Sequence, residues 1–280
     1  MPSTISEYDT DLSQKHAEIY REDSSLYWFS STIQKFLISL LPANKEAAVL
    51  DLACGSGEYC HRVADLGYKE VVGIDISAAQ ISECHKRSSS RQRVPHFIQA
   101  NAADLLHDPQ FHEKFDVVNA AWLYSAASDV EQFSRMIRSS AACLKKGGLL
   151  TAVDVNFDIR PSEPAEWDDF GISVLDDKPF TYRPKTGDAI LGRFDMLSDA
   201  TATSRADRTT GVEITVTFFD KSIYCNEFAR SGLNDLHFFP PSEWPLEQLA
   251  SSPTNADRFR RYSMANPDLV GMTAVKGEAG

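Results

Sequence analysis

Short apolar runs and helix-like segments alternate through the first 155 residues, and this alternation predicts a parallel α/β sheet. The runs over 47–52, 71–75, 95–99, 115–121 and 148–154 have the length and composition of buried strands. The segments over 57–66, 77–88 and 130–144 lie between them and have the pattern of helices. Strands that alternate with helices form β-α-β units with right-handed crossovers, so the fold class is α/β.

The residues on either side of this region have other patterns. Residues 1–45 carry apolar side chains at three- and four-residue steps, which predicts a helical lid. Residues 156–211 are rich in Pro, Asp, Thr and Gly and contain short β-like pieces. From residue 212 onward, a strand over 212–219, a helix over 221–231 and a last strand over 269–275 complete the pattern. We expect one domain over 1–280, with an N-terminal helical lid (1–45), a cofactor-binding core (46–155), an inserted substrate cap (156–211) and the C-terminal part of the sheet (212–280).

Composition and charge narrow the class of partner. With 28 basic and 40 acidic side chains the formal charge is −12, which argues against nucleic acid because binding to a polyanion depends on Lys and Arg. The N-terminus carries acids and no apolar core, and no apolar run reaches membrane-spanning length. The five cysteines form no C-x-x-C pair and no zinc-ligand spacing, so we interpret them as reduced thiols. We expect a cytoplasmic monomer or homodimer without a bound metal.

A glycine-paired loop after the first predicted strand indicates a nucleoside site. Gly55-Ser56-Gly57 follows the run that contains Asp51, and Asp75 ends the next run. Two glycines let a ligand approach the backbone, the following helix start offers free N–H groups, and an acid at the second strand's end accepts hydrogen bonds from both ribose hydroxyls. The third glycine of a dinucleotide-binding G-x-G-x-x-G is replaced by Cys60, which weakens that interpretation.

Five motifs in order resemble those of class I S-adenosylmethionine-dependent methyltransferases. The pattern D-x-x-x-G-x-G (51–57) resembles the first motif and VVGIDIS (71–77) the second. The segments ANAADL (100–105), FDVVNAAWLY (115–124) and LKKGGLLTAVD (144–154) resemble the adenine-contacting segment and the fourth and fifth motifs. FFPPSEWP (238–245) and LVGMTAVK (269–276) are similar to the small-molecule branch that includes toxoflavin-synthase-like enzymes. The resemblance implies a Rossmann-like, mostly parallel seven-stranded sheet with helices on both faces and an antiparallel last strand.

The same resemblance implies S-adenosylmethionine as cofactor and S-adenosylhomocysteine as product. Asp51 is expected to organise the glycine loop through its backbone N–H groups, Asp75 to hold the ribose, and Ile76 to pack on the adenine. Asn101 stands where the family often has Asp, and its amide can still accept from and donate to an adenine. The full set of expected cofactor-binding residues is Tyr20, Asp51, Ala53, Gly55, Gly57, Asp75, Ile76, Asn101, Ala102 and Ala120.

The substrate pocket is expected above the carboxyl ends of the strands, where open α/β sheets bind ligands. Its expected aromatic walls are Tyr27, Trp28, Trp122, Phe180 and Tyr182. The candidate catalytic residues are Tyr124 and His237, whose imidazole can take a proton from an N–H or O–H nucleophile.

The expected reaction is methyl transfer from S-adenosylmethionine to a small-molecule N or O nucleophile of secondary metabolism, driven mainly by positioning. Two alternatives stay open. An NAD(P)-dependent oxidoreductase on the same fold class would need the third loop glycine and usually a Tyr-x-x-x-Lys pair. A non-methylating scaffold protein that binds the cofactor is also compatible with this fold.

Overall fold

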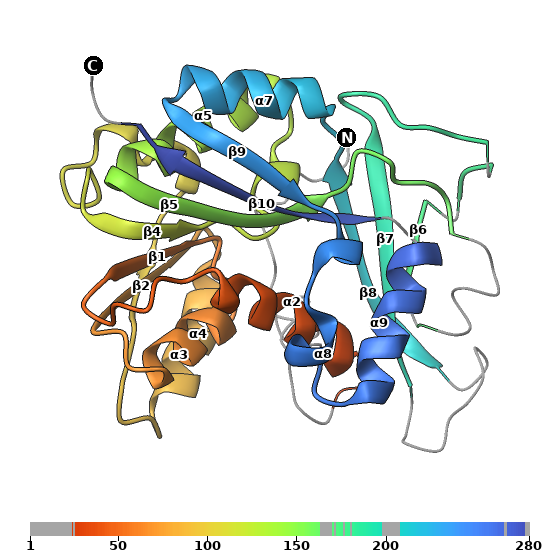
Figure 1. Ribbon diagram of the computed structural model, residues 1–280, viewed down its shortest axis with the longest axis horizontal. Coiled ribbons are helices and arrows are strands. Elements are labelled where there is room, and N and C mark those ends of the chain that lie inside the picture. Colours follow the sequence, from red (N-terminus) through yellow and green to blue (C-terminus); the bar gives the residue numbers. More distant parts are fainter. Residues whose placement is uncertain are drawn as a thin grey trace.

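A seven-stranded sheet in the order β3-β2-β1-β4-β5-β10-β9 forms the centre of the protein (Figure 1). The computed structural model describes residues 24, 26–162, 170, 172–175, 177–179, 181–197, 208–265 and 268–277. The strands are β1 (Ala48–Leu52), β2 (Glu70–Asp75), β3 (His96–Gln99), β4 (Phe115–Asn119), β5 (Leu144–Val155), β9 (Leu233–Phe239) and β10 (Leu269–Lys276). β10 runs antiparallel to both neighbours and the first five strands are parallel, which confirms the expected architecture.

Helices cover both faces of this sheet. The first face carries α2 (Tyr27–Ser39), α3 (Glu58–Asp65) and α4 (Ala78–Ser88), and the opposite face carries α5 (Val130–Cys143) and α7 (Lys221–Arg230) (Figure 1). Because successive side chains of a strand point to opposite faces, Val49 packs in the apolar cluster on the first face and Leu50 in the cluster on the second. Burial on both faces explains why these strands are continuous apolar runs in the sequence.

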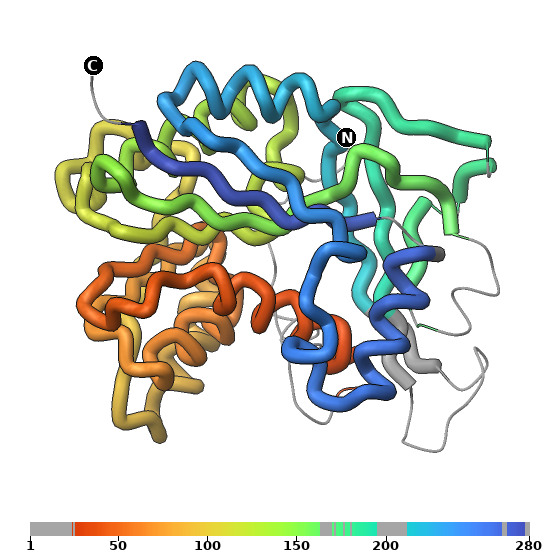
Figure 2. The backbone as a smooth tube through the Cα atoms, in the orientation of Figure 1, coloured from red at the N-terminus to blue at the C-terminus, as the bar shows by residue number. Residues whose placement is uncertain are grey.

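Helix α2, the described part of the expected lid, is a core helix. It packs against α8 (Leu246–Leu249) and α9 (Pro253–Ala265) from the C-terminal part of the chain, and Figure 2 shows these segments side by side. Phe36 of α2 stacks on Trp244 with ring centroids 4.0 Å apart and an angle of 2° between the ring planes. Phe29 stacks on Phe259 at 6.0 Å. Long-range aromatic packing therefore holds this helix in place.

The inserted segment forms a second, three-stranded antiparallel sheet in the order β6-β7-β8, which we call the cap sheet. Its strands are β6 (Ile172–Val174), β7 (Ala189–Leu197) and β8 (Arg208–Thr217). The expected boundary at residue 211 is wrong, because it falls inside β8 and Val212 pairs with Phe194 of β7. The strand expected to begin at 212 thus belongs to the cap sheet, and β9 takes its place in the main sheet.

Short helical turns complete the described chain. They are η1 (Ala102–His107), η2 (Tyr124–Ala126) and η4 (Pro241–Glu243). Among the described residues, no helix combines the length and the apolar character needed to span a bilayer.

Candidate functional site

The loop after β1 holds three residues in the left-handed region of backbone conformation. They are Ala53 (φ 58°), Gly55 (φ 53°) and Gly57 (φ 78°). For a non-glycine residue such as Ala53 this conformation costs about 1–2 kcal/mol, and such strain clusters at functional sites. A Cβ atom added at Gly55 would meet no atom of the described residues within 4 Å, so these residues leave the space over Gly55 open to a ligand.

Gly57 has a different role from the one expected. It is the N-cap of α3, and an added Cβ would lie 2.8 Å from Cζ of Phe97 and 2.9 Å from Sγ of Cys84. The second glycine therefore serves the close packing of α3 against β3 and α4, whereas the space at Gly55 is the part open to a ligand.

Asp75, at the end of β2, is bound to the glycine loop. Its Oδ2 accepts the N–H of Gly55 at 2.9 Å and its Oδ1 accepts the N–H of Ser77 at 2.9 Å. Burial raises the pKa of this carboxyl group, and the two backbone N–H donors act in the opposite direction. Each carboxylate oxygen has a second lone pair, so the group can accept further hydrogen bonds from a diol.

Asp51 lies beneath the loop in a buried polar network. Its Oδ1 accepts from Nδ2 of Asn119 at 2.7 Å, its Oδ2 accepts from the thiol of Cys60, and Oδ1 of Asn119 accepts from the hydroxyl of Thr151 at 3.1 Å. Burial raises the pKa of Asp51 to about 7. The expected contact between Asp51 and the loop's backbone is wrong, because Asp75 accepts the Gly55 amide instead.

The sequence analysis did not identify Asn119 and Thr151 as part of this network, although their polar side chains within strands were a signal. Both are buried polar residues within otherwise apolar strands. A buried polar side chain needs a partner, and each of these finds it on the neighbouring strand.

The residues expected around the adenine lie beside Asp75. Ile76 follows it directly and is 43% exposed, which makes it one of the few large apolar side chains facing outward. Asn101 is the N-cap of η1: its Oδ1 accepts the N–H of Ala103 at 3.0 Å and its Nδ2 donates to Asp104 at 2.8 Å. Ala102 and Ala120 are buried. Contacts between these residues and an adenine stay a prediction.

A family model described as "Methyltransferase domain" matches residues 49–148, the segment that holds this loop and both carboxyl groups. This segment of the chain is therefore similar to methyltransferase domains. The malonyl-[acyl-carrier protein] O-methyltransferase of Enterobacter lignolyticus (strain SCF1) is 27% identical over 171 residues, which cover 61% of this chain and 57% of that protein. The ubiquinone biosynthesis O-methyltransferase of Brucella ovis is 35% identical over 107 residues, 38% of this chain and 40% of that protein. The chain thus spans about half the length of these curated relatives.

The fold is shared with solved methyltransferases across nearly the whole chain. The CcbJ methyltransferase of Streptomyces caelestis aligns with a TM-score of 0.60 and 13% identity, covering 97% of this chain and all of that one. At 13% identity this similarity supports a shared fold, which extends to the residues of the chain outside 49–148.

The residues at the loop fit the adenosyl group of S-adenosylmethionine, the cofactor that the sequence motifs imply. Gly55 leaves open space, Asp75 keeps acceptor capacity for two ribose hydroxyls, and Ile76 offers an outward-facing apolar surface beside it. This combination is the one a nucleoside requires: backbone approach, diol recognition and an apolar face.

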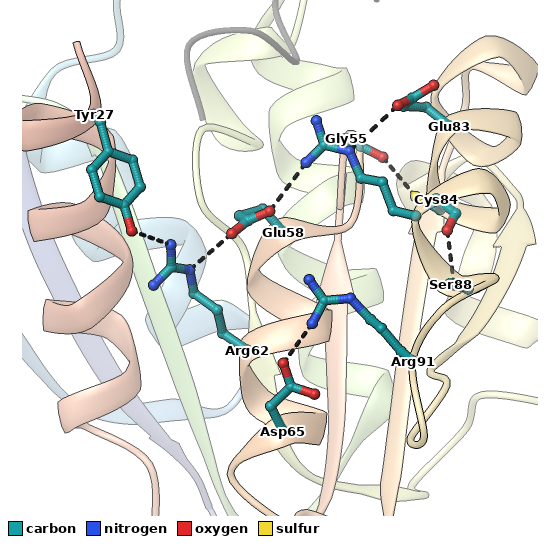
Figure 3. A network of polar contacts seen from close by, with 10 residues as sticks. Tyr27, Gly55, Glu58, Arg62, Asp65, Glu83, Cys84, Ser88 and Arg91 are labelled. Carbon is teal, nitrogen blue, oxygen red and sulfur yellow. Dashed lines mark hydrogen bonds and ion pairs between the residues drawn. The ribbon is translucent and has the colours of Figure 1, made fainter. Parts of the chain in front are cut away.

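A chain of polar contacts ties the loop's helices to α2 (Figure 3). Nη2 of Arg62 donates to the Tyr27 hydroxyl at 2.9 Å, and Nε of Arg62 donates to Glu58 at 3.0 Å. Arg87 of α4 donates to the other carboxyl oxygen of Glu58 at 3.1 Å. Tyr27, expected to line the substrate pocket, therefore has its hydroxyl engaged with α3.

The other aromatic candidates for the substrate pocket lie in three different settings. Trp28 is buried among the rings of the core, 4% exposed. Trp122 follows β4 with φ 59°, and its N–H donates to the carbonyl of Val153 at 2.7 Å. Tyr182 donates to Asp188 at 2.6 Å within the cap. Tyr20 and Phe180 lie outside the described residues.

The structure argues against one of the two candidate catalytic residues, Tyr124. Tyr124 is completely buried, donates its hydroxyl to Ser140 at 3.2 Å, and packs against Phe133 and Phe228 on the face opposite α3. It belongs to the core and cannot touch a substrate.

His237 lies on the edge strand β9, where its ring packs on Phe239 at 4.2 Å. The strand is four positions from β1 in the sheet, about 19 Å at a spacing of about 4.8 Å per strand. This places His237 at the edge of the sheet, and its expected catalytic role stays a prediction.

Proposed function

We propose that this protein transfers the methyl group of S-adenosylmethionine to a small-molecule N or O nucleophile, a specialised metabolite or its precursor. The observation that carries the proposal is the pairing of Asp75 with the open glycine loop, within the segment matched by the methyltransferase family model. The names of the two curated relatives, both O-methyltransferases acting in small-molecule biosynthesis or on a carrier-bound acid, support the substrate class.

Positioning is the main task of the chain in such a reaction. The bound cofactor supplies an activated methyl carbon on a sulfonium, so no metal or strong acid is required for activation. Asp75 and the Gly55 loop orient the adenosyl part, and the left-handed backbone at Ala53 presets the loop before binding. Correct orientation of two reactants is worth roughly 7–11 kcal/mol in favourable systems.

The substrate side of the proposed site lies between the main sheet and the cap sheet. Trp122 follows β4 at the carboxyl edge, and Phe170 of the insertion packs against Trp28 of α2 at 6.3 Å. Aromatic side chains from several elements at this edge suit a small, largely apolar acceptor.

A methyl-transfer screen tests the proposal. The purified protein is incubated with methyl-labelled S-adenosylmethionine and a panel of amines, phenols and heterocycles, and label in the acceptor is counted. The Asp75→Ala variant serves as matched control, since it removes the proposed ribose contact. We expect at least one acceptor to be labelled by the wild type and not by the variant.

Two other results would contradict the proposal. Calorimetric binding of NADH in preference to S-adenosylmethionine would favour the oxidoreductase alternative. Binding of S-adenosylmethionine with no labelling above the level of Asp75→Ala across the panel would favour the non-methylating scaffold.

A further inference from the structure

A buried carboxyl group lies at the carboxyl edge of the main sheet, away from the cofactor loop. Asp268 directly precedes β10, and its carbonyl accepts the N–H of Asn156 at 2.9 Å. The next residue, Leu269, pairs with Val155, the last residue of β5. β10 is two positions from β4, which separates them by about 10 Å across the sheet, and Asp268 lies about 10 Å further along the strand direction than Gly271, the partner of the Val153 whose carbonyl accepts the backbone N–H of Trp122. Ligands of open α/β sheets bind at this edge.

One oxygen of this carboxyl group has no partner. Oδ2 accepts the hydroxyl of Tyr262, whereas Oδ1 is buried and unpaired among the described residues, and the residue is only 7% exposed. Nε1 of Trp28 and Oγ of Ser173 are also buried and unpaired. Because buried polar atoms in proteins almost always have a partner, the unpaired Oδ1 of Asp268 indicates a place where a polar ligand group completes the bonding.

Through Tyr262, Asp268 is bound to a cluster of three aromatic rings, each from a different part of the chain. Trp28 of α2, Phe170 of the insertion and Tyr262 of α9 approach one another with ring centroids 5.4–6.3 Å apart. Figure 1 shows α9 and the cap strands beside the start of β10. The carboxyl group therefore lies where main sheet, cap and α2 meet, at the proposed substrate side.

The protonation state of Asp268 changes near neutral pH. Burial raises its pKa to about 7, and the hydrogen bond from Tyr262 opposes this rise. The charged groups on the surrounding elements are Arg258 and Arg261 of α9, which lie over the rings of Trp28 and Phe170. From α2 and the cap sheet the neighbours are Trp28, Phe170 and Ser173, which do not titrate in this range.

We propose that Asp268 accepts the proton of the methyl acceptor, so that the acceptor atom is an amine N–H or a hydroxyl O–H. This inference rests on the proposed function. The acceptor's lone pair forms the bond to the methyl carbon, the electron pair of the broken methyl–sulfur bond stays on sulfur, and the proton passes to Oδ1 of Asp268. Tyr262 keeps its hydrogen bond to Oδ2 and holds the carboxyl group in position. Acceptors that carry no hydrogen on the reacting atom are then poor substrates.

Kinetics of D268N on an acceptor found by the screen test this role. We expect kcat to fall by about 100-fold or more, the range of general-base catalysis, while KM and the affinity for S-adenosylhomocysteine change by less than about threefold. The wild-type profile of kcat/KM should bend near pH 7 and that of D268N should not. D257N, an exposed change on α9, the helix that carries Tyr262, is the matched control and should keep the wild-type profile. Wild-type kcat in D268N would overturn the inference.

A second measurement separates this inference from the proposed function. The carboxyl carbons of aspartate are labelled with ¹³C, and the Asp268 signal, assigned by its loss in D268N, is followed by NMR from pH 4 to 9. An inflection near pH 7 that moves in Y262F supports the inference. An inflection below about pH 5 overturns it, whether or not the screen returns a labelled acceptor.

Discussion

Replacing Asp75 by Ala tests the cofactor site most directly. The carboxylate offers two acceptor oxygens at the loop, and hydrogen bonds to a charged group contribute roughly 1.5–3 kcal/mol each. Loss of two such bonds to the ribose diol is worth at least about 3 kcal/mol, and each 1.4 kcal/mol is tenfold in affinity, so Kd for S-adenosylhomocysteine should rise about 100-fold or more. The Gly55 and Ser77 N–H groups also lose their acceptor, which adds to the loss by loosening the loop.

The measurement is isothermal titration with S-adenosylhomocysteine on wild type, Asp75→Ala and a matched variant, Glu70→Ala. Glu70 is the exposed first residue of the same strand, so its removal changes the net charge by the same amount at the opposite end of β2. We expect Glu70→Ala to bind within about twofold of wild type, since isolated surface charges have small effects. An Asp75→Ala protein that melts like wild type and binds within about threefold of it would refute the assignment of the ribose site.

Three further predictions follow from the same loop and core. Gly57→Ala should lower the free energy of unfolding by about 2–4 kcal/mol, because the new Cβ adds both left-handed backbone strain and overpacking. Gly55→Ala should lower it by only about 1–2 kcal/mol, because it adds the strain alone. Equal losses of stability in urea denaturation would contradict the different roles of the two glycines. Asp51 keeps its proton in the folded state up to about pH 7, above the ordinary value of 3.8, so its contribution to the free energy of unfolding falls as pH rises from about 4 to 7. Asp51→Asn should therefore gain stability relative to wild type by at most about 4 kcal/mol at pH 8 and little at pH 4, and a pH-independent difference in denaturation would argue against this. Tyr124→Phe and His237→Ala should keep kcat within about twofold in the methyl-transfer assay, because Tyr124 lies in the core and His237 lies on the edge strand β9. A tenfold loss of kcat in either variant would show that the replaced residue takes part in catalysis.

Local pattern was enough to predict the parallel core. Each strand of the core is buried on both faces, so it reads as a continuous apolar run, and the predicted 115–121 and 71–75 differ from β4 and β2 by one or two residues at their ends. The glycine loop and the acid at the end of β2 were also visible, because left-handed backbone and ribose binding each require a residue type that the sequence displays.

Edge strands were harder to predict. β9 reads LNDLHFF, with exposed polar residues at three of its seven positions, because an edge strand of this sheet is only partly covered. The alternating segment from 212 was assigned to the main sheet in its place, although its partner is β7. Which sheet a half-buried strand joins depends on its contacts with residues far away in the sequence. The pattern of the strand itself does not identify those residues.

The sequence by itself determined the order of strands and helices, the position of the glycine loop and the family that these motifs resemble. Only the tertiary structure decided that Asp75 rather than Asp51 accepts the loop amide, that Tyr124 lies in the core, and that Asp268 lies beside Trp28 and Phe170. The physical reason is that periodicity encodes which face of an element is buried, whereas the partner of a polar side chain depends on how elements far apart in the chain pack together.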